Sequence, residues 1–343
     1  MELKVREGDL LENHEGLIFD VKGLIHPPER IIAFLRYYPD PSGNRIRAGI
    51  RYKKIYSLEE RYKFLNDRYP QYLFHDKTSG EMLQGILIED IKKIYKPEEL
   101  MKKLLQKGEN GQGKSSLIIE KALEMVKLIQ NQSNINFDKI GLTGSCLVNL
   151  EIEQSDIDKI IYGIKNAYLI KEALITLYKS HKETICPYSH ENIINLYEFR
   201  GKESNLNFQE FVKIEQRKKL QGIFKGKEYY IRCIKDWNEI NGQNIQYKPL
   251  GIGIARGLVV NDEEAILTPC RYLIENSEVI DGMKISEPIR EIVSFRGRFC
   301  EQAQKGENIE ARGKVEKVIS DREIYLRLLL GTYKEDYFRI LNR

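Results

Sequence analysis

The first third of the chain alternates between apolar and polar residues with the two-residue period of half-buried strands. "GLIFDVKGLI" and "RIIAFLRYY" are rich in branched and aromatic residues, and the turn residues of "PDPSGNR" follow them. This pattern predicts strands from residue 1 to about residue 56. "SLEERYKFLNDRYP" then predicts a short helix, with Ser57 as its N-cap and Glu60 three residues further on.

The middle of the chain changes to the period of helices. "KPEELMKKLLQK" predicts one helix, and "SSLIIEKALEMVKLIQNQ" predicts a second, with Ile118, Ala122 and Met125 on one face. Between residues 137 and 236 the strand patterns "DKIGLT", "DIDKIIY" and "KEYYIRCIK" alternate with the helix patterns "NAYLIKEALITLYKS" and "NFQEFVKIEQRKKLQGIF". Such alternation is typical of an α/β unit.

Strand and turn patterns return from about residue 246. We therefore predict an α+β fold with a central α/β domain, a mixed sheet with helices, between two small β-rich domains. The expected boundaries are 1–100 for the N-terminal β-rich domain, 101–245 for the central domain and 246–343 for the C-terminal β-rich domain.

Composition excludes several classes of protein. The 343 residues are 31% charged and 41% hydrophobic, with a net charge of +4, which is a globular balance that permits a nucleic-acid partner without requiring one. The five cysteines form no C-x-x-C pair, so neither a zinc site nor a disulfide framework is indicated. No apolar run is long enough for a membrane span, and the N-terminus lacks an apolar signal core, so we expect a cytoplasmic protein without a membrane partner.

Two glycine-containing motifs are candidates for a phosphate-binding site. "GENGQGKSS", from Gly108 to Ser116, has the spacing of a P-loop, in which Lys114 would bind phosphates of ATP. A P-loop needs a buried strand before its glycines, however, and "MKKLLQKGEN" has a helical pattern. We therefore favour a linker that ends in a helix cap over a P-loop ATPase.

The second motif is "GLTGSCLVNLEIEQSDIDKIIYG". Gly144 and Ser145 end one strand, and after a ten-residue gap Asp156 and Asp158 open another. Side chains two apart in a strand share a face, with Cα atoms roughly 6.5 Å apart, which suits carboxylates that share a hard cation. A glycine allows the backbone to approach a triphosphate closely. The alternative is a pair of acidic surface residues at the start of a strand.

This combination of G-S, gap and D-x-D resembles the polymerase-β-like nucleotidyltransferase superfamily over roughly residues 115–236. The whole arrangement is also similar to an archaeal group of predicted nucleotidyltransferases with β-rich flanks. The resemblance implies that Asp156 and Asp158 bind Mg²⁺ or Mn²⁺ as cofactor. It also implies that Gly144 and Ser145 hold the triphosphate of an NTP substrate.

The chain departs from the superfamily at the third carboxylate. In "EYYIRCI", Tyr230 stands where the resemblance places an aspartate, so Glu228 on the same strand face is the candidate third catalytic acid, with Asp236 as a weaker one. Arg232 is expected to face inward toward the phosphates. Arg217 and Lys218 of "EQRKKLQG" are further candidates for nucleotide binding, or else part of a solvated helix face.

The leading hypothesis is a metal-dependent nucleotidyltransferase that moves a nucleoside monophosphate from an NTP to a hydroxyl and releases pyrophosphate. RNA and DNA are candidate acceptors, because basic and aromatic residues interleave between Arg36 and Lys54. The alternative, which Tyr230 favours, is a degenerate nucleotide- or RNA-binding protein on the same fold. The resemblance leaves the acceptor, the base preference and the oligomeric state open.

Overall fold

The computed structural model describes residues 3–109, 116–200, 205–240, 245–282 and 287–341. The chain forms two compact units, each built from several segments. Unit 1 comprises Met1–Asp76, Glu81–Tyr162 and Phe224–Arg232. Unit 2 comprises Lys77–Gly80, Gly163–Ile223 and Cys233–Arg343.

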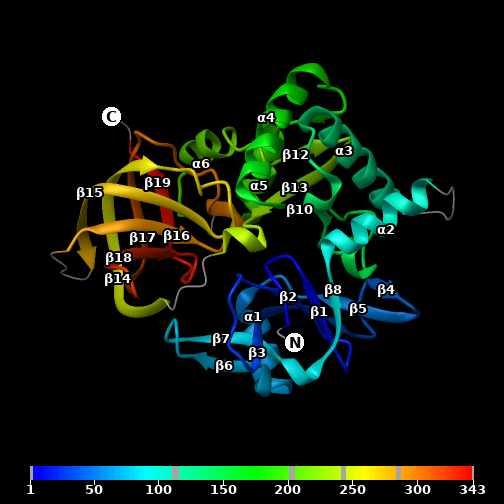
Figure 1. Ribbon diagram of the computed structural model, residues 1–343, viewed down its shortest axis with the longest axis horizontal. Helices are drawn as coiled ribbons and strands as arrows, with labels where there is room; N and C mark the ends of the chain where they lie inside the picture. Colours follow the sequence, from blue (N-terminus) through cyan, green and yellow to red (C-terminus); the bar gives the residue numbers. More distant parts are fainter. Residues whose placement is uncertain (1–2, 110–115, 201–204, 241–244, 283–286, 342–343) are drawn as a thin grey trace. The chain divides into compact units, whose positions relative to one another are not determined.

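Unit 1 contains an eight-stranded sheet, drawn in blue and cyan in Figure 1. Its main path runs β4-β5-β3-β2-β1-β8, and β7 joins β3 to β6. The strands are β1 (Leu10–Asn13), β2 (Ile18–Val21), β3 (Arg30–Pro39), β4 (Arg45–Arg47), β5 (Ile50–Lys54), β6 (Leu73–Asp76), β7 (Glu81–Leu87) and β8 (Ile91–Tyr95). Along β3 buried and half-buried residues alternate, as the two-residue period predicted.

Helix α1 (Leu58–Arg68) follows β5 and confirms the predicted cap. The side chain of Ser57 accepts a hydrogen bond from the backbone N–H of Glu60 at 3.3 Å. Because this bond satisfies a free helical donor, it fixes the point where the chain turns from β5 into the helix.

A five-stranded sheet has the order β11-β12-β13-β10-β9. These strands are β9 (Ile140–Leu142), β10 (Ile157–Tyr162), β11 (Ile185–Cys186), β12 (Gln221–Phe224) and β13 (Lys227–Ile234). The helices between them in sequence and before them are α2 (Pro97–Glu109), α3 (Leu117–Ser133), α4 (Ile164–Ser180), α5 (His190–Arg200) and α6 (Phe208–Glu215). Helix α3 buries the predicted face, which includes Ile118, Ala122 and Met125.

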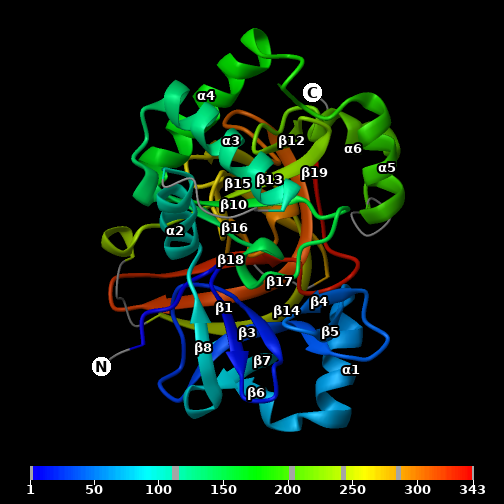
Figure 2. The same ribbon diagram turned by 90° about the vertical axis from the view of Figure 1, so that its right-hand side faces the viewer.

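The third sheet, in unit 2, closes into a barrel, drawn in yellow to red (Figures 1 and 2). Its strands are β14 (Ile245–Asn261), β15 (Cys270–Gly282), β16 (Ile289–Ser294), β17 (Asn308–Ser320), β18 (Ile324–Leu330) and β19 (Tyr337–Ile340). The order is β14-β15-β16-β18-β17, and β17 returns to β14 and also pairs with β19. Only the β16–β18 pair is parallel among the barrel pairings described.

The first five strands of this barrel have the connectivity of an OB-fold, the five-stranded Greek-key barrel. The first strand pairs with the second and fourth, and the third lies parallel to the fifth. A short 3-10 helix, Gly297–Phe299, occupies the connection between the third and fourth strands. The interior is apolar, and Tyr272 and Phe338 meet there edge to face with ring centroids 5.0 Å apart.

The predicted fold class is wrong in its central element. The chain is broadly α+β, but the described residues form three sheets and six α-helices, so the fold is rich in strands. A separate central α/β domain does not form, because β9, β10 and most of β13 belong to unit 1, whereas α4, β11 and most of β12 belong to unit 2. The units therefore do not follow the predicted boundaries of 1–100, 101–245 and 246–343. Alternation reveals a strand locally but not the distant strands that pack with it.

Two local predictions also need correction. The helix expected over "NFQEFVKIEQRKKLQGIF" ends at Glu215, and residues 221–224 form β12, because Ile223 and Phe224 are better accommodated in a sheet. Among the strand patterns expected after residue 246, "EAILTPCRYLI" forms a strand only from Cys270 onward.

The P-loop-like motif lies largely outside the described residues, which exclude 110–115 and therefore Lys114. The preceding element is described, and it is helix α2, which runs through Gly108 to Glu109. A helix therefore stands where a P-loop requires a strand.

Candidate functional site

Gly144 forms a tight corner at the end of β9. Strands β9 and β10 are antiparallel with Leu142 opposite Lys159, and the Thr143 N–H donates to the Asp158 carbonyl at 3.0 Å. Gly144 has φ +66°, and a Cβ placed on it would lie 2.3 Å from Asp158 Oδ2. The absence of a side chain at Gly144 is therefore what gives the Asp158 carboxylate its space.

The two predicted aspartates lie where β10 begins. Asp158 is half-buried in the strand, whereas Asp156 precedes it and has an exposed side chain. Partial desolvation, then the charges of Asp158 and Glu228, raise the pKa of Asp156 from 3.8 to about 6. Neither aspartate has an ion-pair partner among the described residues. The three predicted acids are therefore close enough to act on one another electrostatically.

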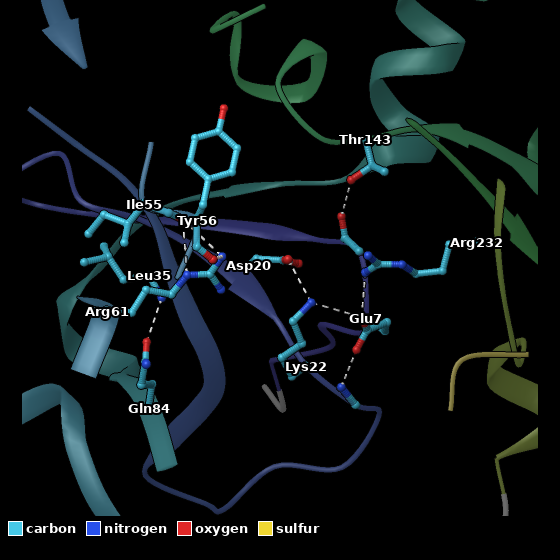
Figure 3. Close-up of polar contacts among 12 residues, drawn as sticks. Glu7, Asp20, Lys22, Leu35, Ile55, Tyr56, Arg61, Gln84, Thr143 and Arg232 are labelled. Carbon is cyan, nitrogen blue, oxygen red and sulfur yellow. Dashed lines mark hydrogen bonds and ion pairs between the residues drawn. The ribbon is translucent and has the colours of Figure 1, made fainter. Parts of the chain in front are cut away.

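The outward face of β13 carries the residues predicted for it. Glu228 is exposed, Tyr230 and Arg232 are half-buried, and the residues between them are buried. Arg232 Nη1 donates to Glu7 Oε1 at 2.6 Å (Figure 3). Burial opposes the charge of Arg232, but the Glu7 and Asp20 carboxylates raise its pKa above the ordinary value. Arg232 is therefore a fixed cation beside the aspartates.

Glu7 holds this cation in place. Its carboxylate is fully buried and also accepts from the backbone N–H of Gly23 at 2.7 Å and from Lys22 Nζ at 3.2 Å (Figure 3). Lys22 in turn donates to Asp20 at 2.8 Å. Burial alone would raise the pKa of Asp20, but Lys22, Arg232 and Arg36 lower it to about 2.

The eight-stranded sheet contributes residues to the site that the glycine and aspartate motif does not indicate. In the β2–β3 pair, Ile18 faces Tyr37 and Phe19 faces Leu35, so Arg36 is the extra residue of a β-bulge. The Leu35 N–H donates to Gln84 Oε1 at 3.0 Å (Figure 3). The Arg36 carbonyl accepts from the Ile55 N–H at 3.1 Å. A bulge re-aims the side chain that it contains, here Arg36.

One pocket in unit 1 joins these two sets of residues. It is open to solvent, with an empty volume of about 410 Å³ that includes solvent at its mouth. Its lining includes four residues that the sequence analysis named at or beside the site, Gly144, Asp158, Tyr230 and Arg232. Asp20, Arg36 and Tyr37 line it from β2 and β3.

Lys54, at the end of β5, is a further cation near the aspartates. Burial, then the charges of Arg36 and Arg45, lower its pKa from 10.5 to about 8, and Asp158 and Asp156 oppose this shift. No ion pair involves Lys54 in the part of the chain that the structure describes. Lys54 and Arg36 are therefore cations without a fixed carboxylate partner, the kind of group that binds phosphate.

Three predicted nucleotide-binding residues lie elsewhere. Ser145 is buried at the start of a short 3-10 helix and does not line the pocket. Arg217 makes two bonds to Glu307, at 2.9 and 3.0 Å, and buried Lys218 pairs with Glu215 at 2.7 Å. Both cations belong to unit 2 and are engaged in these ion pairs. The nucleotide-binding role assigned to the three residues stays a prediction.

The side chains available as metal ligands can be compared with the needs of the predicted Mg²⁺ cofactor. Within the described residues, no group of three or more histidine, cysteine, aspartate or glutamate side chains is arranged to hold a metal ion. Mg²⁺ commonly binds through one or two carboxylates together with substrate phosphates. Asp156 and Asp158 fit that mode, in which the nucleotide completes the coordination. The alternative third acid, Asp236, instead caps a 3-10 helix through the Trp237 N–H at 2.8 Å.

The chain has a full-length relative. The uncharacterized protein MJ1086 of Methanocaldococcus jannaschii is 33% identical over an alignment of 346 positions that covers 98% of each chain. No family model and no solved structure matches the chain. Among the helices described, none combines the length and apolar character needed to cross a membrane. The cytoplasmic location stays a prediction.

Proposed function

The chain belongs to the same family as the uncharacterized protein MJ1086, and we propose that it is a metal-dependent nucleotidyltransferase of the polymerase-β-like type. It would transfer a nucleoside monophosphate from an NTP to a hydroxyl group and release pyrophosphate. The proposal rests on the recognition of Gly144, Asp156 and Asp158 as one motif and on the surroundings of that motif.

The observation that carries the proposal is the approach of Gly144 to Asp158 at the wall of a cationic pocket. Any other residue at position 144 would place its Cβ 2.3 Å from the carboxylate oxygen. Arg36 and Arg232 line the same pocket, which supports a site for a negative, metal-bound ligand beside the carboxylate. A pair of acidic surface residues at a strand start would need neither the glycine nor the arginines.

Each residue has a role that its position supports. Arg36, Arg232 and Lys54 bind the phosphates, and Glu7 keeps Arg232 oriented through its 2.6 Å bond. The acceptor oxygen attacks the α-phosphorus, the bond to the bridging oxygen breaks, and pyrophosphate leaves. The hydroxyl proton goes to a carboxylate, for which Glu228 is the candidate because its charge acts on Asp156.

Asp156 and Asp158 would hold the Mg²⁺ that accompanies the nucleotide. The ion would supply charge stabilisation for the attacking and leaving oxygens. The pKa of about 6 for Asp156 means that its charged form, the form that ligates the ion, predominates at neutral pH.

A second candidate function is nucleotide binding without transfer. Tyr230 favours it, because this residue lines the pocket at the position where the superfamily has a third carboxylate. Such a protein would bind NTP without magnesium-dependent release of pyrophosphate.

The test uses the full chain with Mg²⁺, labelled NTPs and a panel of RNA, DNA and small hydroxyl acceptors. We expect pyrophosphate release and label incorporation, and we expect Asp156→Ala with Asp158→Ala to lower both by about a thousandfold, since metal ligation contributes several kcal/mol. Asp67→Ala, at an exposed acid on α1, is the matched control and should retain activity.

Two outcomes would contradict the proposal. Incorporation that survives the double change would show that the site is elsewhere. Nucleotide binding without pyrophosphate release for any acceptor would favour the second candidate function. A loss of turnover in Lys114→Ala would instead support the P-loop alternative.

A further inference from the structure

Positive charge is concentrated in the segment that borders the pocket. Between residues 36 and 54 the chain has six basic residues and one acidic residue, Asp40. The six are Arg36, Arg45, Arg47, Arg51, Lys53 and Lys54. This concentration stands out because the whole chain carries a net charge of only +4.

Three of these cations bond to other parts of the protein, although the side chain of Arg51 stays exposed. Arg45 donates to the Leu150 carbonyl, Arg47 pairs with Glu12 at 2.6 Å, and Arg51 donates to the Gly43 carbonyl at 3.1 Å. For Arg36, Lys53 and Lys54, no ion pair is found among the described residues. These three cations are therefore not paired with a protein carboxylate in that part of the chain, and a phosphate group of a ligand would neutralise them.

Strand β5 leads from the surface to the site. Arg51 and Lys53 are exposed on one face of the strand. Lys54, on the other face, lies close enough to Asp156 and Asp158 for their charges to act on it. A flexible polyanion that follows Arg51 and Lys53 and then turns over the end of the strand at Lys54 would reach the neighbourhood of the two aspartates.

Two residues after this stretch, Tyr56 supplies an exposed aromatic ring. Tyr56 is 60% exposed, and Lys54 Nζ lies 4.6 Å from the centre of its ring. Arg61 bonds the carbonyls of Ile55 and Tyr56 at 3.1 to 3.2 Å and so fixes the backbone beneath the ring. Figure 3 shows the ring pointing away from these contacts. An ordered ring beside a cation is the arrangement on which a nucleic-acid base stacks.

We infer that Arg51, Lys53, Lys54 and Tyr56 form a docking strip for single-stranded nucleic acid, which presents its terminal hydroxyl to the pocket as the acceptor. This inference rests on the proposed transferase function for the acceptor role only. Phosphates lie along the cations of β5, and a base stacks on Tyr56. A single strand fits better than a duplex, because stacking on a protein ring requires a base that is free of its neighbours.

An independent feature points to the same class of ligand. The barrel of unit 2 has the OB-fold connectivity, which recurs in proteins that bind oligonucleotides and oligosaccharides. Connectivity alone assigns no function. It agrees with the charge of the docking strip, and that charge favours the nucleic acid over an uncharged oligosaccharide.

The experiment measures fluorescence anisotropy of labelled oligo(dT) and oligo(U) with the full chain, over a range of salt concentrations. We expect Arg51→Glu with Lys53→Glu to weaken binding by about tenfold or more and to lower the salt slope by about two, one for each phosphate that the variant no longer neutralises. Tyr56→Ala should weaken binding by about fivefold or more with little change of salt slope, because stacking is not ionic.

Lys92→Glu with Lys93→Glu is the matched control. These two lysines are exposed on β8, and β8 ends the sheet path that begins with β4 and β5. Equal weakening by this control and by the Arg51–Lys53 variant would overturn the docking strip. So would binding that is insensitive to Tyr56→Ala in a variant whose melting temperature is unchanged.

The assay separates the two proposals. If oligonucleotides bind through the docking strip but pyrophosphate is never released, the strip stands as a binding site and the transferase proposal fails. If pyrophosphate is released with a small hydroxyl acceptor while no oligonucleotide binds, the transferase stands and the docking strip is refuted.

Discussion

In the barrel, the buried carboxylate of Glu316 lies 2.6 Å from Lys314 Nζ and 2.7 Å from Arg327 Nη2. In the pocket, Asp158 is half-buried without an ion-pair partner among the described residues, and Arg36 in its lining and Lys54 nearby lack one too. Both regions draw charge away from water, which costs free energy unless something compensates. In the barrel the protein compensates its own charges.

The barrel and the pocket therefore differ in the role of their charges, which stabilise the fold in the barrel and are available to a ligand in the pocket. Glu316 is held by two cations, and Arg327 also stacks on Tyr247 with its Cζ 3.6 Å from the ring centre. In the pocket Arg232 and Asp20 are paired, with Glu7 and Lys22, but in the part of the chain that the structure describes Asp158 and Arg36 are not, so a metal-bound phosphate would satisfy these two. Stability is expected to be the property of the first region and binding the property of the second.

The largest expected effect comes from removing one carboxylate charge in each region. Glu316→Gln should lower the free energy of unfolding by about 3–5 kcal/mol, because it leaves Arg327 and Lys314 buried without a counter-charge. Asp158→Asn should cost little stability or add some, while it abolishes transfer. Urea unfolding of both variants measures the contrast.

A surface pair calibrates that measurement. Glu323 pairs with Arg290 where both side chains are nearly half exposed, so Glu323→Gln should cost less than about 1 kcal/mol. Equal losses for Glu316→Gln and Asp158→Asn would remove the distinction between the two regions.

The next largest effect is expected from the close approach of Gly144 to the Asp158 carboxylate at the pocket wall. Gly144→Ala should lower pyrophosphate release by about a hundredfold, because the new Cβ displaces the Asp158 carboxylate and small displacements of catalytic groups have effects of this size. Gly306→Ala is the control for backbone strain, with φ +88° and open space around the added Cβ. Steady-state kinetics that fall equally in both variants would contradict a specific role for Gly144.

The smallest effect is on the pH dependence of stability. The pKa of Asp156 is raised from 3.8 to about 6, so the folded protein binds this proton more tightly than the unfolded chain. The resulting stability is fully present below about pH 4 and is lost as the pH rises through about 6. Asp156→Asn removes this loss, so its melting temperature relative to wild type should rise between about pH 4 and pH 7. The change is small because solvent screens the exposed side chain, and a flat difference would contradict the raised pKa.

Local patterns predicted much of the site's own segment. The alternation of "EYYIRCI" placed Glu228, Tyr230 and Arg232 on one face of β13, and the structure confirms it. The D-x-D pattern located the start of β10. These features depend on residues within a few positions of one another. The two-residue period of a strand is therefore enough to predict which of them share a face.

The cations were harder to assign. Arg217 and Lys218 precede β13 in sequence and are ion-paired in the structure, and their nucleotide-binding role stays a prediction. Arg36 belongs to the site because a bulge in β3 re-aims it, and beside that bulge the Leu35 N–H bonds to Gln84, 49 positions away in the chain. The glycine and proline residues that predict turns do not predict such a bulge.

The sequence by itself determined where many of the helices and strands lie, where Ser57 caps α1, and which glycine and aspartates form a motif. Only the tertiary structure decided that β2, β3 and β5 supply Asp20, Arg36 and Lys54 to that motif, and that β17 pairs with β14 to close the barrel. The physical reason is that side-chain periodicity acts over a few residues, whereas strand pairing is chosen by the packing of surfaces far apart in the chain.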